Sequence, residues 1–106
     1  MSLIDAIYRG NYELADQLIT NGYGLNETDY DGRTPLMLLL YKLHMNKEKY
    51  KACLELITKL IDAGVNVNIK DGHGWTALFY AVCHNGPIYI IRMLIDAGAD
   101  VNIKQQ

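Results

Sequence analysis

The sequence predicts an all-helical repeat protein, a solenoid in which antiparallel helix pairs are joined by turn or hairpin loops. The segment LIDAGVNVNIK at residues 60–70 recurs almost unchanged as LIDAGADVNIK at residues 94–104. A weaker copy, LITNGYGLN, occupies residues 18–26. The start of the unit recurs as well, as DYDGRTPL at residues 29–36 and DGHGWTAL at residues 71–78. Self-similarity of this kind is the sequence signature of repeat architectures.

Composition restricts the class of partner. The chain has 106 residues, 50% of them hydrophobic and 21% charged, as in an ordinary globular domain. Its net charge of −2 gives no general attraction to nucleic acid or to an anionic membrane, so neither is an expected partner. No apolar run approaches the roughly 18 residues that span a bilayer, and no basic segment opens the chain. We therefore expect a cytoplasmic protein.

The later helix of each unit is expected to have one polar and one buried face. Polar residues recur at spacings of three, four and seven, for example at Glu55, Thr58 and Asp62, which places them on one side of a helix. The residues expected to be buried opposite them are Leu14, Leu18, Ile19, Leu54, Ile57, Ile61, Ile88, Ile91 and Ile95.

Residues typical of helix caps and tight turns mark the ends of the predicted helices. In each unit we call the earlier helix the inner helix and the later one the outer helix. Gly22, Gly64 and Gly98 follow the outer helices, where a residue in the left-handed conformation ends a helix at the lowest energetic cost. The inner helices are expected to open at Thr34-Pro35 and Thr76-Ala77, with the threonine hydroxyl as the cap. Tight turns are expected just before them, at Asp31-Gly32 and His73-Gly74.

The quoted segments resemble the ankyrin repeat, a β-turn followed by two antiparallel helices with a T-P-L-H-x-A signature. Residues 34–37 read TPLM, residues 76–79 read TALF, and residues 97–102 match the family ending A-G-A-D-V-N throughout. The resemblance covers nearly the whole chain as a single domain. It implies an N-terminal repeat without its hairpin at 1–28, a second repeat at 29–70, and a third at 71–104.

Two departures from the family pattern affect the inner helices. Met37 and Phe79 replace the signature histidines, which removes a bond between turn and helix and predicts somewhat looser hairpins. Leu39 and Leu40 stand where the family usually has alanines. They are expected either to push the helix pair apart or to fill a gap against a neighbour.

The second repeat carries an insertion of about nine residues within 42–51, which is expected to lengthen the inner helix and then loop out. It contains Lys42, Lys47, Lys49 and Lys51. One interpretation is a tolerated surface insertion, because loop-closure entropy rises slowly with length. The other is a basic patch that contacts an acidic partner.

No constellation in the sequence predicts catalysis. The chain has a single serine, Ser2, and lacks a P-loop. Cys83 and His84 are adjacent, so on a helix they point apart, and no ligand-spaced pair supports them or His73 as a metal site. Cys53 and Cys83 are expected to pack in the core, a disulfide or reactive thiol being the alternative. We expect no cofactor, no metal and no enzymatic activity.

The resemblance implies that hairpin tips and inner helices bind another protein. Trp75 is the strongest single candidate because aromatic residues dominate interface hot spots, although its ring could instead fold over its own hairpin. The candidate residues carried over by position are Tyr30, Asp31, Arg33, Tyr41, Gly72, His73, Trp75, Cys83 and His84.

The two ends of the chain differ in character. Ser2 is placed to cap the first helix, and that unit is polar, as a terminal repeat must be. The last outer helix is apolar except at Tyr89, Arg92 and Asp96. Either further repeats, a partner or a second copy cover it, or this end is simply less polar than the rule for terminal repeats requires.

The leading hypothesis for function is a non-catalytic protein-binding module. The alternative is a structural segment of a longer array, or a stack that self-associates through its last repeat. The abundance of Ile, Lys, Asn and Tyr fits an AT-rich genome, so a bacterial or viral protein acting on a host protein, as a secreted effector or toxin inhibitor, is a further expectation.

Overall fold

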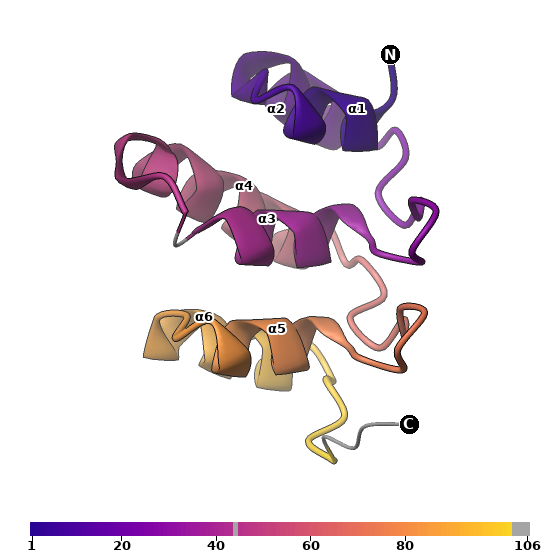
Figure 1. The fold of residues 1–106 in the computed structure, drawn as a ribbon, viewed down its shortest axis with the longest axis vertical. Helices are drawn as coiled ribbons and strands as arrows, with labels where there is room; N and C mark the ends of the chain where they lie inside the picture. The colour runs from indigo at the N-terminus through magenta and orange to yellow at the C-terminus, as the bar shows by residue number, and fades with distance from the viewer. Residues whose placement is uncertain (44, 103–106) are drawn as a thin grey trace.

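The fold is a stack of three antiparallel helix pairs (Figure 1). The computed structural model describes residues 1–43 and 45–102, and all regular structure in these ranges is helical. The predicted all-helical class is confirmed. The end of the third predicted repeat, residues 103 and 104, and position 44 in the insertion lie outside the described ranges. The elements are α1 (Leu3–Tyr8), α2 (Tyr12–Thr20), α3 (Pro35–Leu43), the 3-10 helix η1 (Lys47–Lys49), α4 (Tyr50–Asp62), α5 (Ala77–Cys83) and α6 (Ile88–Asp96).

The inner helices α1, α3 and α5 form one side of the stack, and the outer helices α2, α4 and α6 form the other (Figure 1). The loops that join one pair to the next lie at one end, and the α1–α2 and insertion loops lie at the opposite end. None of the helices in the described ranges combines the length and the apolar character needed to cross a bilayer.

Short side-chain caps start some helices as the sequence predicts. The Ser2 hydroxyl accepts a hydrogen bond from the Asp5 backbone N–H at 3.1 Å, and the Thr34 hydroxyl accepts one from the Met37 N–H at 3.2 Å. The same prediction for Thr76 was wrong, because this residue precedes α5 without a side-chain cap bond. An aspartate, Asp71, ties the turn before α5 to the helix instead.

The middle pair contributes more buried residues to the core than either of the other two pairs. α3 packs against α1, α4 and α5, so it has neighbours on three sides and little polar surface of its own. Leu39 and Leu40 are both buried, with 0% exposure at Leu39. The large side chains therefore fill the space between adjacent pairs, the second of the two predicted alternatives.

The expected buried face of the last helix was wrong for two of its three residues, while Ile91 is half-buried against the core. Ile88 is 70% exposed and Ile95 is 44% exposed, whereas Ile90 and Leu94 are fully buried. The two buried residues are four positions apart and so share one helix face. Because α6 is apolar almost all the way round, its periodicity could not identify the buried face. In the structure, packing against α4 and α5 determines that face. In the earlier outer helices Ile19, Ile57 and Ile61 are buried as predicted, and Leu14, Leu18 and Leu54 are half-buried.

The insertion lengthens the outer helix more than the inner one. The outer helix α4 has 13 residues and α2 and α6 have nine each, while the inner helix α3 has nine and α5 has seven. The prediction that the extra residues extend the inner helix and then loop out was therefore only partly correct. The segment from Met45 through η1 forms the loop, and α4 takes up much of the remainder.

Asparagines join the loops that follow successive outer helices. The Asn26 side-chain oxygen accepts a hydrogen bond from the Asn66 N–H at 3.0 Å. One layer further on, the Asn68 side-chain oxygen accepts from the Asp100 N–H at 2.7 Å, and the Asn68 amide donates to the Gly98 carbonyl at 2.9 Å. Each layer is therefore bonded to the next by a side chain at the same place in the repeat.

The two hairpin turns also touch through their backbones. The Gly72 N–H donates to the Asp31 carbonyl at 2.8 Å. Beside this bond, Gly32 has a φ of +78°, and a Cβ placed there would lie 3.0 Å from the Gly72 nitrogen and 3.2 Å from the Asp71 Cα. A side chain at position 32 would therefore crowd the neighbouring turn.

The substitution Gly32→Ala is expected to lower the free energy of unfolding by about 2 kcal/mol, because the left-handed backbone disfavours alanine and the new methyl group meets the neighbouring turn. Urea unfolding of Gly64→Ala provides a matched control. Gly64 has a φ of +80°, but a Cβ added there would have nothing within 4 Å, so only the backbone cost of about 1 kcal/mol applies. Equal losses in the two variants would contradict a tight contact between the turns.

Candidate protein-binding surface

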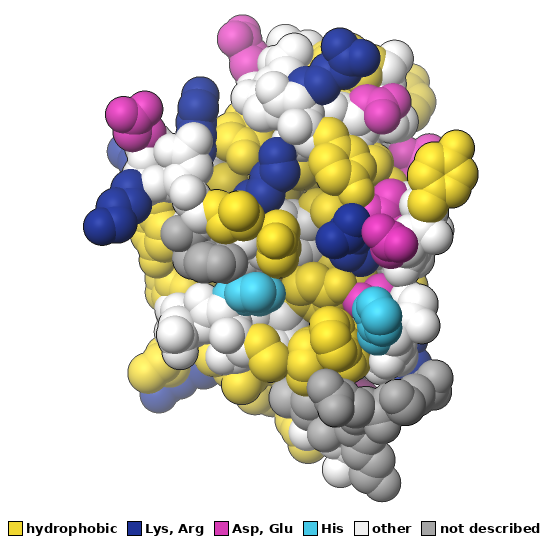
Figure 2. All heavy atoms as spheres, viewed as in Figure 1, with side chains coloured by type: hydrophobic (Ala, Val, Ile, Leu, Met, Phe, Trp, Pro, Cys, Tyr) yellow, Lys and Arg dark blue, Asp and Glu magenta, His cyan; other side chains and the backbone are white. Residues whose placement is uncertain are grey.

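A groove lies between the hairpin loops of the second and third repeats and the inner helices α3 and α5. These two loops are called the second and the third hairpin below. The groove has a volume of about 330 Å³. Figure 2 shows this face, where hydrophobic and histidine side chains gather between the inner helices and acidic and basic side chains lie beside the hairpins. The lining residues are Asp31, Arg33, Tyr41, Asp71, His73, Trp75, Tyr80 and His84. Six of these were predicted as binding residues from the sequence, all except Asp71 and Tyr80.

Asp71 organises the third hairpin. One of its carboxylate oxygens accepts hydrogen bonds from the backbone N–H groups of His73 and Trp75, at 2.8 and 3.0 Å. The other accepts one from the Tyr80 hydroxyl at 2.5 Å. Burial raises the pKa of Tyr80, and its bond to Asp71 raises it further, so the phenol remains the donor. The turn and helix α5 are thereby held as one unit.

Asp29 holds the second hairpin in the same way. Its Oδ1 accepts from the N–H groups of Asp31 and Arg33, both at 2.9 Å, and its Oδ2 accepts from the Tyr8 hydroxyl on α1. Neither aspartate, nor the tyrosine that bonds to it, was predicted from the sequence. The signal that could have found them is the acid that opens both turn segments, DYDGR and DGHGW.

Arg33 is partly a structural residue. Its Nε donates to Asp29 Oδ2 at 3.1 Å and its Nη2 donates to Asp31 Oδ2 at 3.0 Å. The same Nη2 lies 3.3 Å from the Tyr8 hydroxyl, so the guanidinium also connects the hairpin to the first helix. This arginine is therefore fixed in place, and its charge is balanced by carboxylates on both sides.

Trp75 adopts the packed arrangement that the sequence left open. Its ring stacks on Phe79 at a centroid distance of 4.3 Å, and the His73 ring lies 5.0 Å from it. Phe79 stands where the family has its signature histidine, so an aromatic stack takes the place of the missing imidazole bond. At the equivalent place in the second repeat, the Thr34 N–H donates to the Met37 sulfur at 3.4 Å. The indole remains half-buried, with part of its surface lining the groove.

Tyr41 on α3 and His84 at the end of α5 meet edge to face, with centroids 5.3 Å apart. They line the end of the groove farther from the hairpins. The other three predicted residues lie outside the groove. Tyr30 projects fully exposed from a hairpin tip, Gly72 joins the two tips through its N–H, and Cys83 is exposed.

The two cysteines occupy different environments. Cys53 is buried and Cys83 is exposed, and both are free thiols. The core position predicted for Cys83 was therefore wrong, because its side chain lies on the outward-facing part of the last turn of α5. Within the described residues, no group of three or more His, Cys, Asp or Glu side chains is arranged to hold a metal ion.

The pH dependence of stability should reveal the Asp29 network. Burial raises the pKa of Asp29, but the hydrogen bonds from Tyr8, Arg33 and Asp31 outweigh it, so the net pKa is lowered. The unfolded value is about 3.9. The stabilisation is therefore complete above that pH and is lost as the pH falls through the lower folded value.

Urea unfolding between pH 2 and 6 should show this loss, and Asp29→Asn should flatten the acid limb of the stability curve. Asp96→Asn, on the exposed end of α6, provides the matched control. If the two variants gave the same acid limb as the unmodified chain, the Asp29 carboxylate would not be a source of stability.

Three stacked helix pairs, linked by hairpins that meet edge to edge, define a class of repeat protein whose loops and inner helices form one continuous surface. The chain belongs to the ankyrin repeat family. The sequence model of that family, described as ankyrin repeats in three copies, matches residues 3–105. Ankyrin repeats are in general protein–protein interaction modules and are typically non-catalytic.

A fowlpox virus (strain NVSL) protein that is named for its ankyrin repeats is similar to this chain. The two are 29% identical over an alignment with a length of 101, which covers 76% of this chain and 24% of the viral protein. The chain therefore spans about a quarter of the length of this relative.

Proposed function

We propose that the chain is a non-catalytic module that binds another protein through the hairpin tips and the groove between α3 and α5. The observation that carries the proposal is the convergence of six sequence-predicted residues on one groove, with Tyr30 exposed at the tip next to Asp31. Tyrosine, tryptophan and arginine, the residue types enriched in hot spots, all line it.

The groove is supported by a rigid frame. Asp29 and Asp71 fix the two turns, and the bond from Gly72 to the Asp31 carbonyl fixes one turn against the other. A surface that is already ordered loses little conformational entropy on binding, so a modest contact area can give useful affinity. This preorganisation supports recognition of a folded or extended protein partner at the groove.

The test is quantitative affinity capture from cells of the source organism, comparing the unmodified chain with the triple variant Tyr30→Ala, Asp31→Ala, Tyr41→Ala. These positions are exposed, and Arg33 and Trp75 are left intact because they support the fold. The matched control is Tyr89→Ala, Asp96→Ala on the outer helix α6.

A partner captured by the unmodified chain and the control, but depleted about tenfold with the triple variant, would support the proposal. Circular dichroism must show that all three proteins are folded. Equal capture by the triple variant and the unmodified chain would contradict it.

A second candidate function is stacking on a further copy or on further repeats through the last helix pair. The supporting observation is a group of exposed apolar side chains on α5, α6 and the segment after them. Its members are Val82, Ile88, Ile95 and Val101. Sedimentation velocity over a hundredfold range of concentration tests it. Self-association that Ile88→Lys, Ile95→Lys abolishes would support this candidate, and a monomer at every concentration would exclude stacking between copies.

A further inference from the structure

Charge is distributed unevenly along the molecule. Segment 42–51 contains four lysines and one acid, Glu48, and Arg9 lies at the end of α1. The hairpin loops at 23–34 and 65–76 contain four acids and two bases. Half of the ten Lys and Arg residues of a chain with net charge −2 are therefore Arg9 and the lysines of the insertion.

The basic end contains a hollow of about 510 Å³ between the first helix pair and the insertion. It is separate from the hairpin groove, since the two share no lining residue. Three of its lining residues are cations, Arg9 from the end of α1 and Lys42 and Lys49 from segment 42–51, and no lining residue is an acid. The lining residues are Tyr8, Arg9, Gly10, Tyr12, Lys42, Met45, Asn46 and Lys49.

Two of these cations are held in place by the fold. The Lys42 ammonium donates to the carbonyl oxygens of Ile7 and Tyr8, at 2.9 and 3.3 Å, where α1 ends and its exposed carbonyls attract positive charge. The Lys49 ammonium lies 5.8 Å from the centroid of the Tyr12 ring, within reach of a cation–π contact. Arg9, the C-cap of α1, is exposed beside them.

We propose that this hollow binds an acidic segment of a partner protein, with carboxylates opposite Arg9, Lys42 and Lys49. The tyrosine rings and Met45 would contact the apolar parts of the same segment. The site is thus a second contact area at the opposite end of the helices from the hairpins, and it does not depend on the groove. This site would attract a negatively charged ligand. The hairpin loops carry excess negative charge and would not attract the same ligand.

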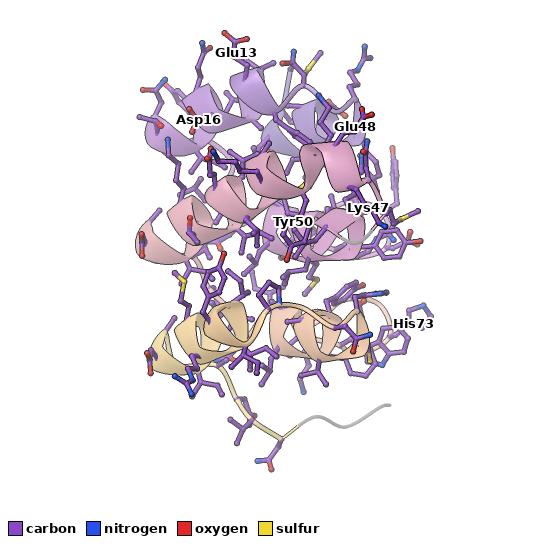
Figure 3. The ribbon with its side chains drawn as sticks, turned by 90° about the vertical axis from the view of Figure 1, so that its left-hand side faces the viewer. Glu13, Asp16, Lys47, Glu48, Tyr50 and His73 are labelled. Carbon is purple, nitrogen blue, oxygen red and sulfur yellow. The ribbon has the colours of Figure 1, made fainter. Side chains whose placement is uncertain are left out.

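The surroundings favour an acidic peptide over nucleic acid. Figure 3 shows Glu13 and Asp16 on α2 and Glu48 beside Lys47 in the insertion. A separate cavity between α2 and α4 is lined by Glu13, Asp16, Glu55 and one base, Lys59, which pairs with Asp16. Acids therefore outnumber bases next to the basic site on its outer-helix side. A phosphate backbone that continued past the hollow in that direction would be repelled, whereas a short run of Asp or Glu could end within it.

The experiment is a titration of the ¹⁵N-labelled chain with a blocked hexaglutamate peptide, followed by two-dimensional NMR. Hexaglutamine is the neutral control ligand. The test variant is Arg9→Gln, Lys49→Gln, which spares the Lys42 contacts with α1. The matched variant is Lys70→Gln, Arg92→Gln, which makes the same change in net charge away from the hollow. The triple variant of the groove is titrated in parallel.

We expect hexaglutamate to shift the amides of residues 8–12 and 45–50, and hexaglutamine to shift none of them. The test variant should weaken binding about tenfold, because two charge contacts are lost, while the matched and groove variants should remain within about twofold. Equal weakening in the test and matched variants would overturn the proposal, since attraction would then depend on net charge alone. Tighter binding of a thymidine heptanucleotide at the same amides would overturn it in favour of nucleic acid.

Discussion

The substitution Asp71→Ala should lower the free energy of unfolding by about 3 kcal/mol or more. It removes three hydrogen bonds from a carboxylate that is only 7% exposed, and it leaves the backbone N–H groups of His73 and Trp75 without their acceptor. Bonds to a charged group contribute about 1.5 to 3 kcal/mol each, and unsatisfied donors add a further cost. Urea unfolding followed by far-UV circular dichroism measures the change.

Asp31→Ala is the matched control for this variant, because it removes a carboxylate from the neighbouring turn. That side chain is 70% exposed and contacts Arg33 at the surface, so its loss should cost less than about 1 kcal/mol. Asp71→Asn, which keeps the oxygen that accepts from the two N–H groups, should fall between the two. If Asp71→Ala and Asp31→Ala were equally stable, the aspartate would not be the support of the third hairpin.

The second large effect is expected at the centre of the stack, where Leu39→Ala should cost about 3 kcal/mol. The leucine is completely buried in α3, which contacts α1, α4 and α5, so a cavity formed there cannot collapse from a solvent-exposed side. Deletion of a buried leucine side chain typically costs about 2 to 5 kcal/mol, through lost burial and the remaining cavity. The same urea experiment provides the measurement.

Ile88→Ala provides the comparison. It removes a branched aliphatic side chain that is mostly exposed, so the loss should stay within about 0.5 kcal/mol. A small effect at Leu39 would show instead that the neighbouring helices close over the gap. That result would agree with the alanines that the family usually has at this position.

Much of the fold could be predicted because each repeat provides an independent test of the pattern seen in the others. The glycines that end the outer helices and the turns before the inner helices appear more than once in the same surroundings, so a chance match at one copy is corrected by the others. The prediction was wrong at α6 and at the insertion, for different reasons. The face of α6 could not be chosen from a helix with apolar residues all round, and the insertion has no second copy to show which helix it extends.

Most of the residues that line the groove were selected from the sequence, but the residues that support it were not. Exposed aromatic and charged residues at hairpin and inner-helix positions were recognisable from the family pattern. Asp29 and Asp71 were not, because an aspartate at a turn is ordinarily explained by local backbone geometry. Their bonds to Tyr8 and Tyr80 depend on chain segments that only the folded structure brings together. The same limit applies to Trp75, whose stacking partner is four residues further along a helix that the sequence does not orient.

The asparagine bonds between loops affect how the molecule opens. Because Asn26 and Asn68 each bond to the backbone of the next layer, one loop cannot unfold without breaking hydrogen bonds to its neighbour. Such coupling between adjacent layers makes the stack behave as a short one-dimensional cooperative chain. Hydrogen exchange should therefore be slowest in α3 and α4, which have a layer on each side, and opening should proceed by whole helix pairs from the ends inward.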